Sequence, residues 1–234
     1  MNKYEWLLFD IDNTLLDFSK ASKESLFKTF LDHDMVCTEE IYKTYNIENA
    51  KVWIDFENKK IDTETLKRIR FAGFFDLMGI NKINPFDFNT AYIENMVAVS
   101  EAYTGAVELI QKVSSNHRVS IITNGLKEAQ RPRLARVGMI EMFDSIVVSD
   151  EIGVAKPDVR FFEYTYNSIP NPPDKSKILV VGDNLMSDIR GGQNFGVDTC
   201  WVSHKKENLS NVKPTFMIDT VFEIESVLLK GLKS

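Results

Sequence analysis

The hydrophobic pattern of this 234-residue chain changes character twice. A short apolar run at 6–9 stands alone near the start and predicts a buried strand. From about residue 19 to residue 102, apolar side chains recur at helical spacing without a convincing strand, and one such stripe consists of Leu66, Ile69, Phe74 and Leu77. From Gly105 onward, short apolar runs alternate with helical stretches. The pattern therefore predicts a helical block inserted into a domain of alternating helices and strands.

The second half of the chain supplies most of the expected sheet. Strands are predicted at 119–122, 145–148, 178–181, 199–202 and 216–218. The helices between and after them are predicted at 106–113, 126–137, 158–167 and 189–195, with a last one through Leu228 and Leu229. Strands that are almost continuously apolar and separated by helices favour a parallel sheet covered on both faces. We therefore expect an α/β fold, and the strand at 6–9 needs that sheet to pair with.

Composition and charge exclude some functions without changing this fold. The net charge is −6 and the chain has no dense cluster of Lys and Arg, which disfavours binding to long nucleic acid but permits small anionic ligands. No apolar stretch of 18 residues is present, so no membrane span is expected, and the first apolar run is too short for a signal peptide. The two cysteines, Cys37 and Cys200, lie far apart, as in proteins of a reducing compartment. We expect a cytoplasmic monomer or small homo-oligomer.

The first predicted strand ends in two carboxylates spaced two residues apart, Asp10 and Asp12. In an extended chain, alternate side chains point the same way, so both acids can project into one small volume. Their repulsion opposes folding, and such pairs persist where a metal cation, a shared proton or a chemical role offsets it. The alternative is a turn in which one acid caps the following helix.

Other predicted strands also end in chemically useful residues. Thr123, Asn124 and Gly125 follow one strand, Asp183 follows another with Asp188 beyond it, and Lys156 precedes a helix. Taken singly, each has a plain structural explanation. Thr123, Asn124 and Gly125 suit a turn or a helix cap. Asp183 suits a turn, Asp188 is a charge at a helix start, and Lys156 is a surface lysine. In an open α/β sheet, however, ligands bind outside the carboxyl ends of the strands. The joint arrival of these residues at one edge of one sheet therefore indicates a functional site.

Together these residue types suit phosphoryl transfer. Asp10, Asp183 and Asp188 are oxygen ligands of the kind that Mg²⁺ prefers, and Lys156 adds a second cation against the transferring group. Thr123 and the backbone N–H groups beyond it suit the phosphoryl oxygens. Asp10 is placed to attack phosphorus and form an aspartyl-phosphate. Asp12 is placed to protonate the leaving oxygen and then to deprotonate water.

Four motifs match, in order, those of the haloacid dehalogenase-like (HAD) hydrolase superfamily, which the chain resembles over its whole length. They are Phe9-Asp10-Ile11-Asp12-Asn13-Thr14-Leu15, Ile122-Thr123-Asn124-Gly125, Ala155-Lys156-Pro157, and Val181-Gly182-Asp183 with Asp188. The resemblance implies a Rossmann-like catalytic core made of residues 1–16 and 104–234. It also implies an α-helical cap inserted at 17–103, between the first and second motifs.

The resemblance also implies roles for the acids. Asp10 is the nucleophile, and Asp12 is the general acid/base whose backbone carbonyl binds Mg²⁺. Asp183 completes the metal site with these two residues, and Asp188 supports the metal site without binding the ion directly.

The resemblance also assigns the remaining motif residues to the binding of the substrate and its phosphate. Thr123 and Asn124 bind the substrate, and Lys156 steadies the phosphoryl group.

A finer similarity is to the pyrimidine 5′-nucleotidase subfamily. It includes Gln130, Arg133-Leu134, Gly138, Phe143-Asp144, Ser149 to Pro157, Cys200-Trp201 and the cap segment 52–58. It implies a phosphatase that hydrolyses small phosphomonoesters, with a nucleoside 5′-monophosphate as the expected substrate.

Three other functions stay open at this point. A phosphotransferase or phosphatase acting on a sugar phosphate or another small metabolite fits the same core motifs. The metal-independent dehalogenase branch is disfavoured, because Asp12 and the pair Asp183 and Asp188 suit phosphorus and Mg²⁺. A non-enzymatic phospho-accepting signalling module also clusters acids, a Thr and a Lys. That module is shorter, lacks a large helical insert and must keep its phosphoryl group, whereas an acid/base such as Asp12 removes it.

The helical block offers aromatic side chains for a substrate's leaving group. Trp53, Phe56, Phe71, Phe74 and Phe75 form a candidate stacking surface for a base. Most of them are expected to pack between helices instead, because aromatic stripes at helical spacing are typical of a core.

Overall fold

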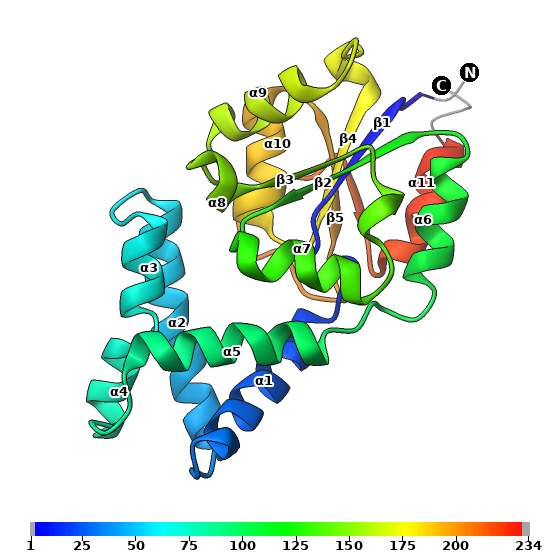
Figure 1. The fold of residues 1–234 in the computed structure, drawn as a ribbon. Helices are drawn as coiled ribbons and strands as arrows, with labels where there is room; N and C mark the ends of the chain where they lie inside the picture. Colours follow the sequence, from blue (N-terminus) through cyan, green and yellow to red (C-terminus); the bar gives the residue numbers. More distant parts are fainter. Residues whose placement is uncertain (1–2, 231–234) are drawn as a thin grey trace.

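A computed structural model describes residues 3–230 and shows a six-stranded, fully parallel sheet with helices on both faces (Figure 1). The strands are β1 (Trp6–Phe9), β2 (Arg118–Thr123), β3 (Ser145–Val148), β4 (Ile178–Gly182), β5 (Asp198–Val202) and β6 (Phe216–Ile218). Their order in space is β3-β2-β1-β4-β5-β6. The predicted α/β fold is confirmed, and the order is that of a doubly wound sheet whose direction reverses beside β1.

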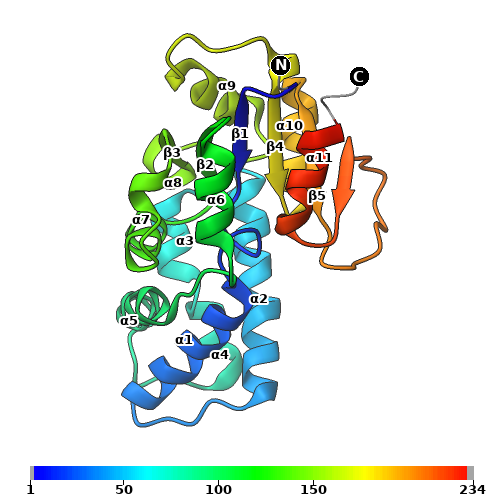
Figure 2. The same cartoon turned by 90° about the vertical axis from the view of Figure 1, so that its right-hand side faces the viewer.

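Alternation along the strands divides the core of this domain between two faces. Leu7 and Phe9 of β1 point into one apolar cluster, which α6 (Ala106–Ser114), α7 (Lys127–Arg136) and α11 (Ile224–Lys230) cover. Trp6 and Leu8 point into the other cluster. Phe161 of α9 (Val159–Ser168) and Phe195 of α10 (Arg190–Phe195) close that second face (Figures 1 and 2). Every strand residue of β1 is therefore buried, because helices flank the sheet on both sides.

The segment between β1 and α6 forms a separate layer of five helices beyond the carboxyl ends of the strands (Figures 1 and 2). They are α1 (Phe18–Asp32), α2 (Glu39–Glu57), α3 (Thr63–Ile69), α4 (Ala72–Met78) and α5 (Pro85–Val99). We call this layer the cap. It has its own apolar cluster, rich in aromatic rings, in which Tyr45 and Phe71 stack with centroids 5.0 Å apart.

One predicted helical stripe of the cap is split in the structure. The stripe from Leu66 to Leu77 is not one helix but two, because α3 ends at Ile69 and α4 begins at Ala72. The apolar phase shifts there, since the next buried side chain after Leu66 that joins the aromatic cluster is Phe71, five residues on. The break lets Phe71 turn inward with the rings that follow it, and it leaves Leu77 63% exposed.

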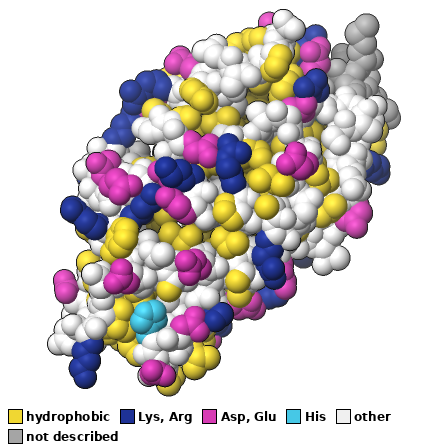
Figure 3. Space-filling model, viewed as in Figure 1, with side chains coloured by type: hydrophobic (Ala, Val, Ile, Leu, Met, Phe, Trp, Pro, Cys, Tyr) yellow, Lys and Arg dark blue, Asp and Glu magenta, His cyan; other side chains and the backbone are white. Residues whose placement is uncertain are grey.

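The surface and the helix lengths add two observations. On the face drawn in Figure 3, Lys and Arg side chains alternate with Asp and Glu side chains, without a large patch of one sign. Among residues 3–230, no helix combines the length and the apolar character needed to cross a membrane. The short elements that were not predicted from the sequence include α8 (Ser149–Ile152) and a π-helical turn at Leu185–Ile189.

Candidate active site

All seven residues singled out in the sequence line one cavity between the sheet and the cap. Asp10 and Asp12 follow β1, Thr123 ends β2 and Asn124 follows it, Lys156 follows α8, and Asp183 and Asp188 follow β4. The cavity has a volume of about 240 Å³. It opens at the carboxyl ends of β1 and β4, which are neighbours at the reversal of strand order, the usual place for a ligand in such a sheet.

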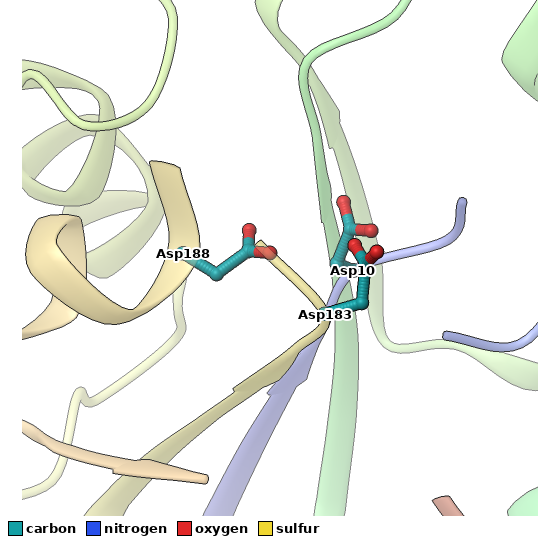
Figure 4. A group of neighbouring side chains, drawn as sticks. All are labelled: Asp10, Asp183 and Asp188. Atoms are coloured by element: carbon teal, nitrogen blue, oxygen red, sulfur yellow. The ribbon is translucent and has the colours of Figure 1, made fainter. Parts of the chain in front are cut away.

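Three carboxylates from two neighbouring strand ends converge in this cavity. Asp10, Asp183 and Asp188 each offer an oxygen atom, and these atoms lie within 4.8 Å of one another. Figure 4 shows Asp10 and Asp183 side by side, with Asp188 directed toward them from the turn that follows β4. Asp10 is 6% exposed and Asp188 is 1% exposed, so much of this negative charge is withdrawn from water.

Lys156 neutralises part of the cluster from within. Its ammonium donates to Asp10 Oδ1 at 2.7 Å, to Asp188 Oδ1 at 2.6 Å and to the carbonyl of Ile122 at 2.8 Å. These three bonds use all the N–H groups of the ammonium. Burial alone would lower the pKa of Lys156, but the attraction of the two carboxylates outweighs it and the pKa is raised. Lys156 is therefore a permanent cation beside the predicted nucleophile.

One lysine does not balance three acids. Burial raises the pKa of Asp10 well above its ordinary value despite Lys156, and Asp188 adds to that rise. Burial, with the charge of Asp188, also raises the pKa of Asp183 to about 7. No residue in the described range 3–230 donates a hydrogen bond to the Asp183 carboxylate. The site is thus short of positive charge and retains an unused oxygen ligand.

Local backbone features place Asp188 within this group. Its Oδ1 accepts from Lys156 and its Oδ2 accepts from the N–H of Asn184 at 3.0 Å, so both oxygens are engaged. The π-helical turn at 185–189 carries the side chain back toward β4, where it passes directly over Gly182. A Cβ at position 182 would overlap the Asp188 carboxylate, which explains why a glycine precedes Asp183.

Two side chains of α7 hold the carboxylate of Asp12. Arg133 Nη1 donates to Asp12 Oδ1 at 2.6 Å, and Gln130 Nε2 donates to Asp12 Oδ2 at 2.9 Å. Arg133 is 1% exposed and also donates from Nε to Ser100 at the end of α5. Its Nη1 donates in addition to Gln130 Oε1 at 2.7 Å, which makes the two residues one unit. Asp12 is therefore oriented by α7 and, through Arg133, linked to the cap.

Thr123 and Asn124 are engaged in different ways. Gln130 Nε2 donates to Thr123 Oγ1 at 2.6 Å, so the hydroxyl hydrogen of Thr123 is left to donate elsewhere. The Asn124 amide exchanges two hydrogen bonds of 2.7 Å with the backbone N–H and carbonyl of Lys156. The side chain of Asn124 thus fixes the position of Lys156. A contact between Asn124 and a substrate falls to its backbone N–H group.

Several residues of the site were not given a role from the sequence. Gln130 and Arg133 were noted only as part of a resemblance, and their spacing of three residues on a helix just after Thr123 was the available signal. From the cap, the cavity is lined by Phe18, Asn49, Trp53, Glu57, Arg70, Tyr92, Ile93 and Met96. Among the aromatic candidates, Trp53 lies on the cavity, whereas Phe71, Phe74 and Phe75 are buried in the cap cluster.

Comparisons with known proteins agree with this geometry. Residues 7–202 match the family model of haloacid dehalogenase-like hydrolases. The chain is 36% identical to the pyrimidine 5′-nucleotidase YjjG of Escherichia coli, over 97% of this chain and 99% of that protein. It is 32% identical to the pyrimidine 5′-nucleotidase PynA of Streptococcus pneumoniae, over 98% of this chain and 97% of that protein.

A solved structure matches the fold as well as the sequence. The HAD-hydrolase YfnB from Bacillus subtilis, solved bound to magnesium in a form that reveals interdomain movement, superposes with a TM-score of 0.90. The two chains are 29% identical, and the match covers 97% of this chain and 99% of that one. The resemblance seen in the four sequence motifs is confirmed: this chain belongs to the haloacid dehalogenase-like hydrolase family, and it is an enzyme of that family.

Proposed function

We propose that the protein is a Mg²⁺-dependent phosphatase that hydrolyses nucleoside 5′-monophosphates, with a pyrimidine base, through an aspartyl-phosphate. The observation that carries this proposal is the convergence of Asp10, Asp183 and Asp188 within 4.8 Å, beside the buried cation Lys156. The names of the two relatives, both pyrimidine 5′-nucleotidases over nearly the whole chain, support the choice of substrate.

The donor set suits a magnesium ion. Asp10 and Asp183 would hold it with carboxylate oxygens and Asp12 with its backbone carbonyl, while Asp188 supports them. Mg²⁺ prefers oxygen ligands and keeps several waters, and it commonly binds substrate phosphate as well. When bound, the ion would supply positive charge that offsets both the acids and the phosphoryl dianion. The carboxylate of Asp183 is not engaged by any residue in the range 3–230, so its oxygens are available to a cation.

Asp10 is the proposed nucleophile. Lys156 holds its Oδ1, which leaves Oδ2 without a hydrogen bond from any residue in the range 3–230. Attack by this carboxylate forms a bond from oxygen to phosphorus, while the bond from phosphorus to the leaving oxygen breaks. A water then attacks the same phosphorus, and the bond to Asp10 breaks to release phosphate.

Asp12 is the proposed general acid/base. It gives a proton to the leaving oxygen in the first step and takes one from water in the second. Arg133 and Gln130 each donate to one of its oxygens, which leaves a second lone pair on each oxygen for the transferred proton. Thr123 donates its free hydroxyl hydrogen to a phosphoryl oxygen, and the backbone N–H of Asn124 is a second donor.

The direct test is Asp10→Asn, assayed by phosphate release from uridine 5′-monophosphate with Mg²⁺ and with a chelator. The variant keeps the size of the side chain but removes the nucleophile, so turnover should fall by at least about 10³-fold. Thermal unfolding of the same variant should remain cooperative, because an amide can still accept from Lys156. Wild-type turnover in Asp10→Asn would remove the covalent mechanism, and full activity of the wild type in chelator would remove the metal.

A further inference from the structure

Arg70 is a buried cation of the cap without an acidic partner. It follows α3 and is 5% exposed, yet no carboxylate in residues 3–230 lies within ion-pair distance of its guanidinium. Glu57, the cap acid that lines the same cavity, accepts from Asn124 instead. Burying a charge without a partner is costly, and natural proteins rarely keep such a group unless something else uses it.

The polar neighbours of Arg70 leave donors unused. Its Nε donates to Asn49 Oδ1 at 2.9 Å, and its guanidinium makes no other hydrogen bond within residues 3–230. A guanidinium carries five N–H groups, which one acceptor cannot satisfy. Because Arg70 Nε is a donor, Asn49 must present its oxygen to it, and the two N–H groups of Asn49 Nδ2 have no partner in the described chain. Arg70 and Asn49 thus present donors and no acceptor to the cavity.

Flat aromatic surfaces border these donors. The guanidinium carbon of Arg70 lies 4.7 Å from the ring centroid of Tyr92 and 5.9 Å from that of Trp53. Arg70, Asn49, Tyr92 and Trp53 line the same cavity as Asp10, so a ligand attached to the reacting phosphorus can extend to them. Tyr92 is fully buried with the guanidinium over its ring, whereas Trp53 is half-buried, so the far end of this cavity combines one aromatic surface with an edge of N–H donors.

We propose that Arg70 and Asn49 form the recognition subsite for the base of the substrate, and that they bind its carbonyl oxygens. This assignment rests on the function proposed above. A pyrimidine ring is planar and carries carbonyl oxygen at its edge, so it matches both the indole of Trp53 and the donor edge. A second anionic group fits less well, because the cavity already holds the carboxylates of Asp10, Asp183 and Glu57.

The test compares two substrates that differ only in the base. Uridine 5′-monophosphate and ribose 5-phosphate share the phosphate and the sugar, so the ratio of their kcat/KM values measures recognition of the base. In Arg70→Gln, kcat/KM for uridine 5′-monophosphate should fall by about 10- to 100-fold, the effect of losing hydrogen bonds from a charged donor. The value for ribose 5-phosphate should stay within about twofold, since the phosphate site is intact.

Two further variants keep the test decisive. Asn49→Asp retains the size of the side chain but replaces the free donor with a carboxylate oxygen, which also pairs with Arg70, so it should lose the same preference. Arg68→Gln is the matched control, because Arg68 lies two residues before Arg70 and is exposed. It should leave both kcat/KM values unchanged. Uridine alone should inhibit ribose 5-phosphate hydrolysis in the wild type and much less in the two subsite variants.

The outcomes separate the subsite from the overall function. Wild-type enzyme that hydrolyses ribose 5-phosphate as well as uridine 5′-monophosphate would overturn the nucleotidase function. A wild-type preference for the nucleotide that survives in both Arg70→Gln and Asn49→Asp would overturn the subsite alone. A greater loss for a phosphomonoester that carries a carboxylate than for the nucleotide would assign Arg70 to an anionic group, and so would also overturn the proposal.

Discussion

At the scale of single residues, Asp12 depends on a side chain that no motif identifies. Arg133 is buried and binds Asp12 at one nitrogen and Ser100 at another, and its Nη2 has no hydrogen-bond partner among the described residues. An arginine held in this way fixes the direction of the carboxylate that we propose as the acid/base. Arg133 is therefore a positioning residue for the proposed acid/base.

The role of Arg133 should be visible when the Arg133→Met variant is compared on two substrates with different leaving groups. A nucleoside leaves as an alkoxide and needs a proton, whereas 4-nitrophenolate leaves without one. We expect kcat/KM for uridine 5′-monophosphate to fall by about 10²-fold, the scale of general acid catalysis, and kcat/KM for 4-nitrophenyl phosphate to fall much less. Steady-state kinetics on the two substrates measure the difference. Equal losses for both would show that Arg133 serves the structure only.

Asp183 gives a second prediction at this scale, on stability and pH. Its pKa is raised to about 7 in the folded chain, above that of an unfolded aspartate near about 3.9. Between these values the folded state binds a proton that the unfolded state does not, so this group makes the protein less stable as pH rises from about 4 to 7. Metal-free Asp183→Asn should avoid that loss.

Thermal unfolding in chelator measures this effect. At pH 7.5 the melting temperature of Asp183→Asn should exceed that of the metal-free wild type by about 2–8 °C, allowing for partial solvent screening. At pH 4.5 the two should be closer. Adding Mg²⁺ at pH 7.5 should stabilise the wild type more than the variant. If the melting temperature of the metal-free wild type is the same at both pH values, the loss of stability assigned to Asp183 is wrong.

At the scale of elements, the sheet and the helical character of the cap were predictable, whereas the break between α3 and α4 was not. Apolar runs bounded by polar residues gave every strand, because strands buried on both faces need such runs. The predicted strand 178–181 ends one residue further, at Gly182. The clustering of the acids also followed from the sequence, since parallel strands meet at one edge.

What the sequence could not show depends on contacts between distant elements. The break between α3 and α4 arises because Phe71 packs on Tyr45 of another helix, which no local pattern contains. Arg133 and Asp12 are 121 residues apart, so their pairing appears only when α7 lies beside the end of β1. The same holds for the lysine of the site, whose position is fixed by the amide of Asn124.

At the scale of the whole molecule, ion pairs join the cap to the core. Lys67 of α3 is 8% exposed and lies 2.9 Å from Glu128 of α7 and 3.7 Å from Asp150 of α8. Lys59, after α2, pairs with Asp158 at the start of α9. Because Lys67 is nearly buried, its pairs are less screened by solvent than those of an exposed lysine. They favour the arrangement in which the cap covers the cavity.

Lys67→Met should therefore weaken closure of the cap over the substrate. We expect KM for uridine 5′-monophosphate to rise by about fivefold, equivalent to about 1 kcal/mol for a partly buried pair, without a loss in kcat. Lys51→Met is the control, because Lys51 is exposed and, within residues 3–230, its one ion pair is with Glu48 of its own helix. Raising the ionic strength should increase KM for the wild type and change that of Lys67→Met less. Unchanged KM in Lys67→Met would show that these pairs do not govern closure.

The position of β1 has a consequence for how the molecule is made. Trp6 opposes Arg118 on one side and Ile178 on the other, so β1 is synthesised before both of its partner strands and waits for them. A nascent chain halted before residue 178 carries Asp10, the proposed nucleophile, but neither Asp183 nor Asp188. Such long-range pairing is slow to form, and an unpaired apolar strand invites aggregation meanwhile. Because the proposed metal site needs Asp183, we expect chains truncated before that residue to be inactive.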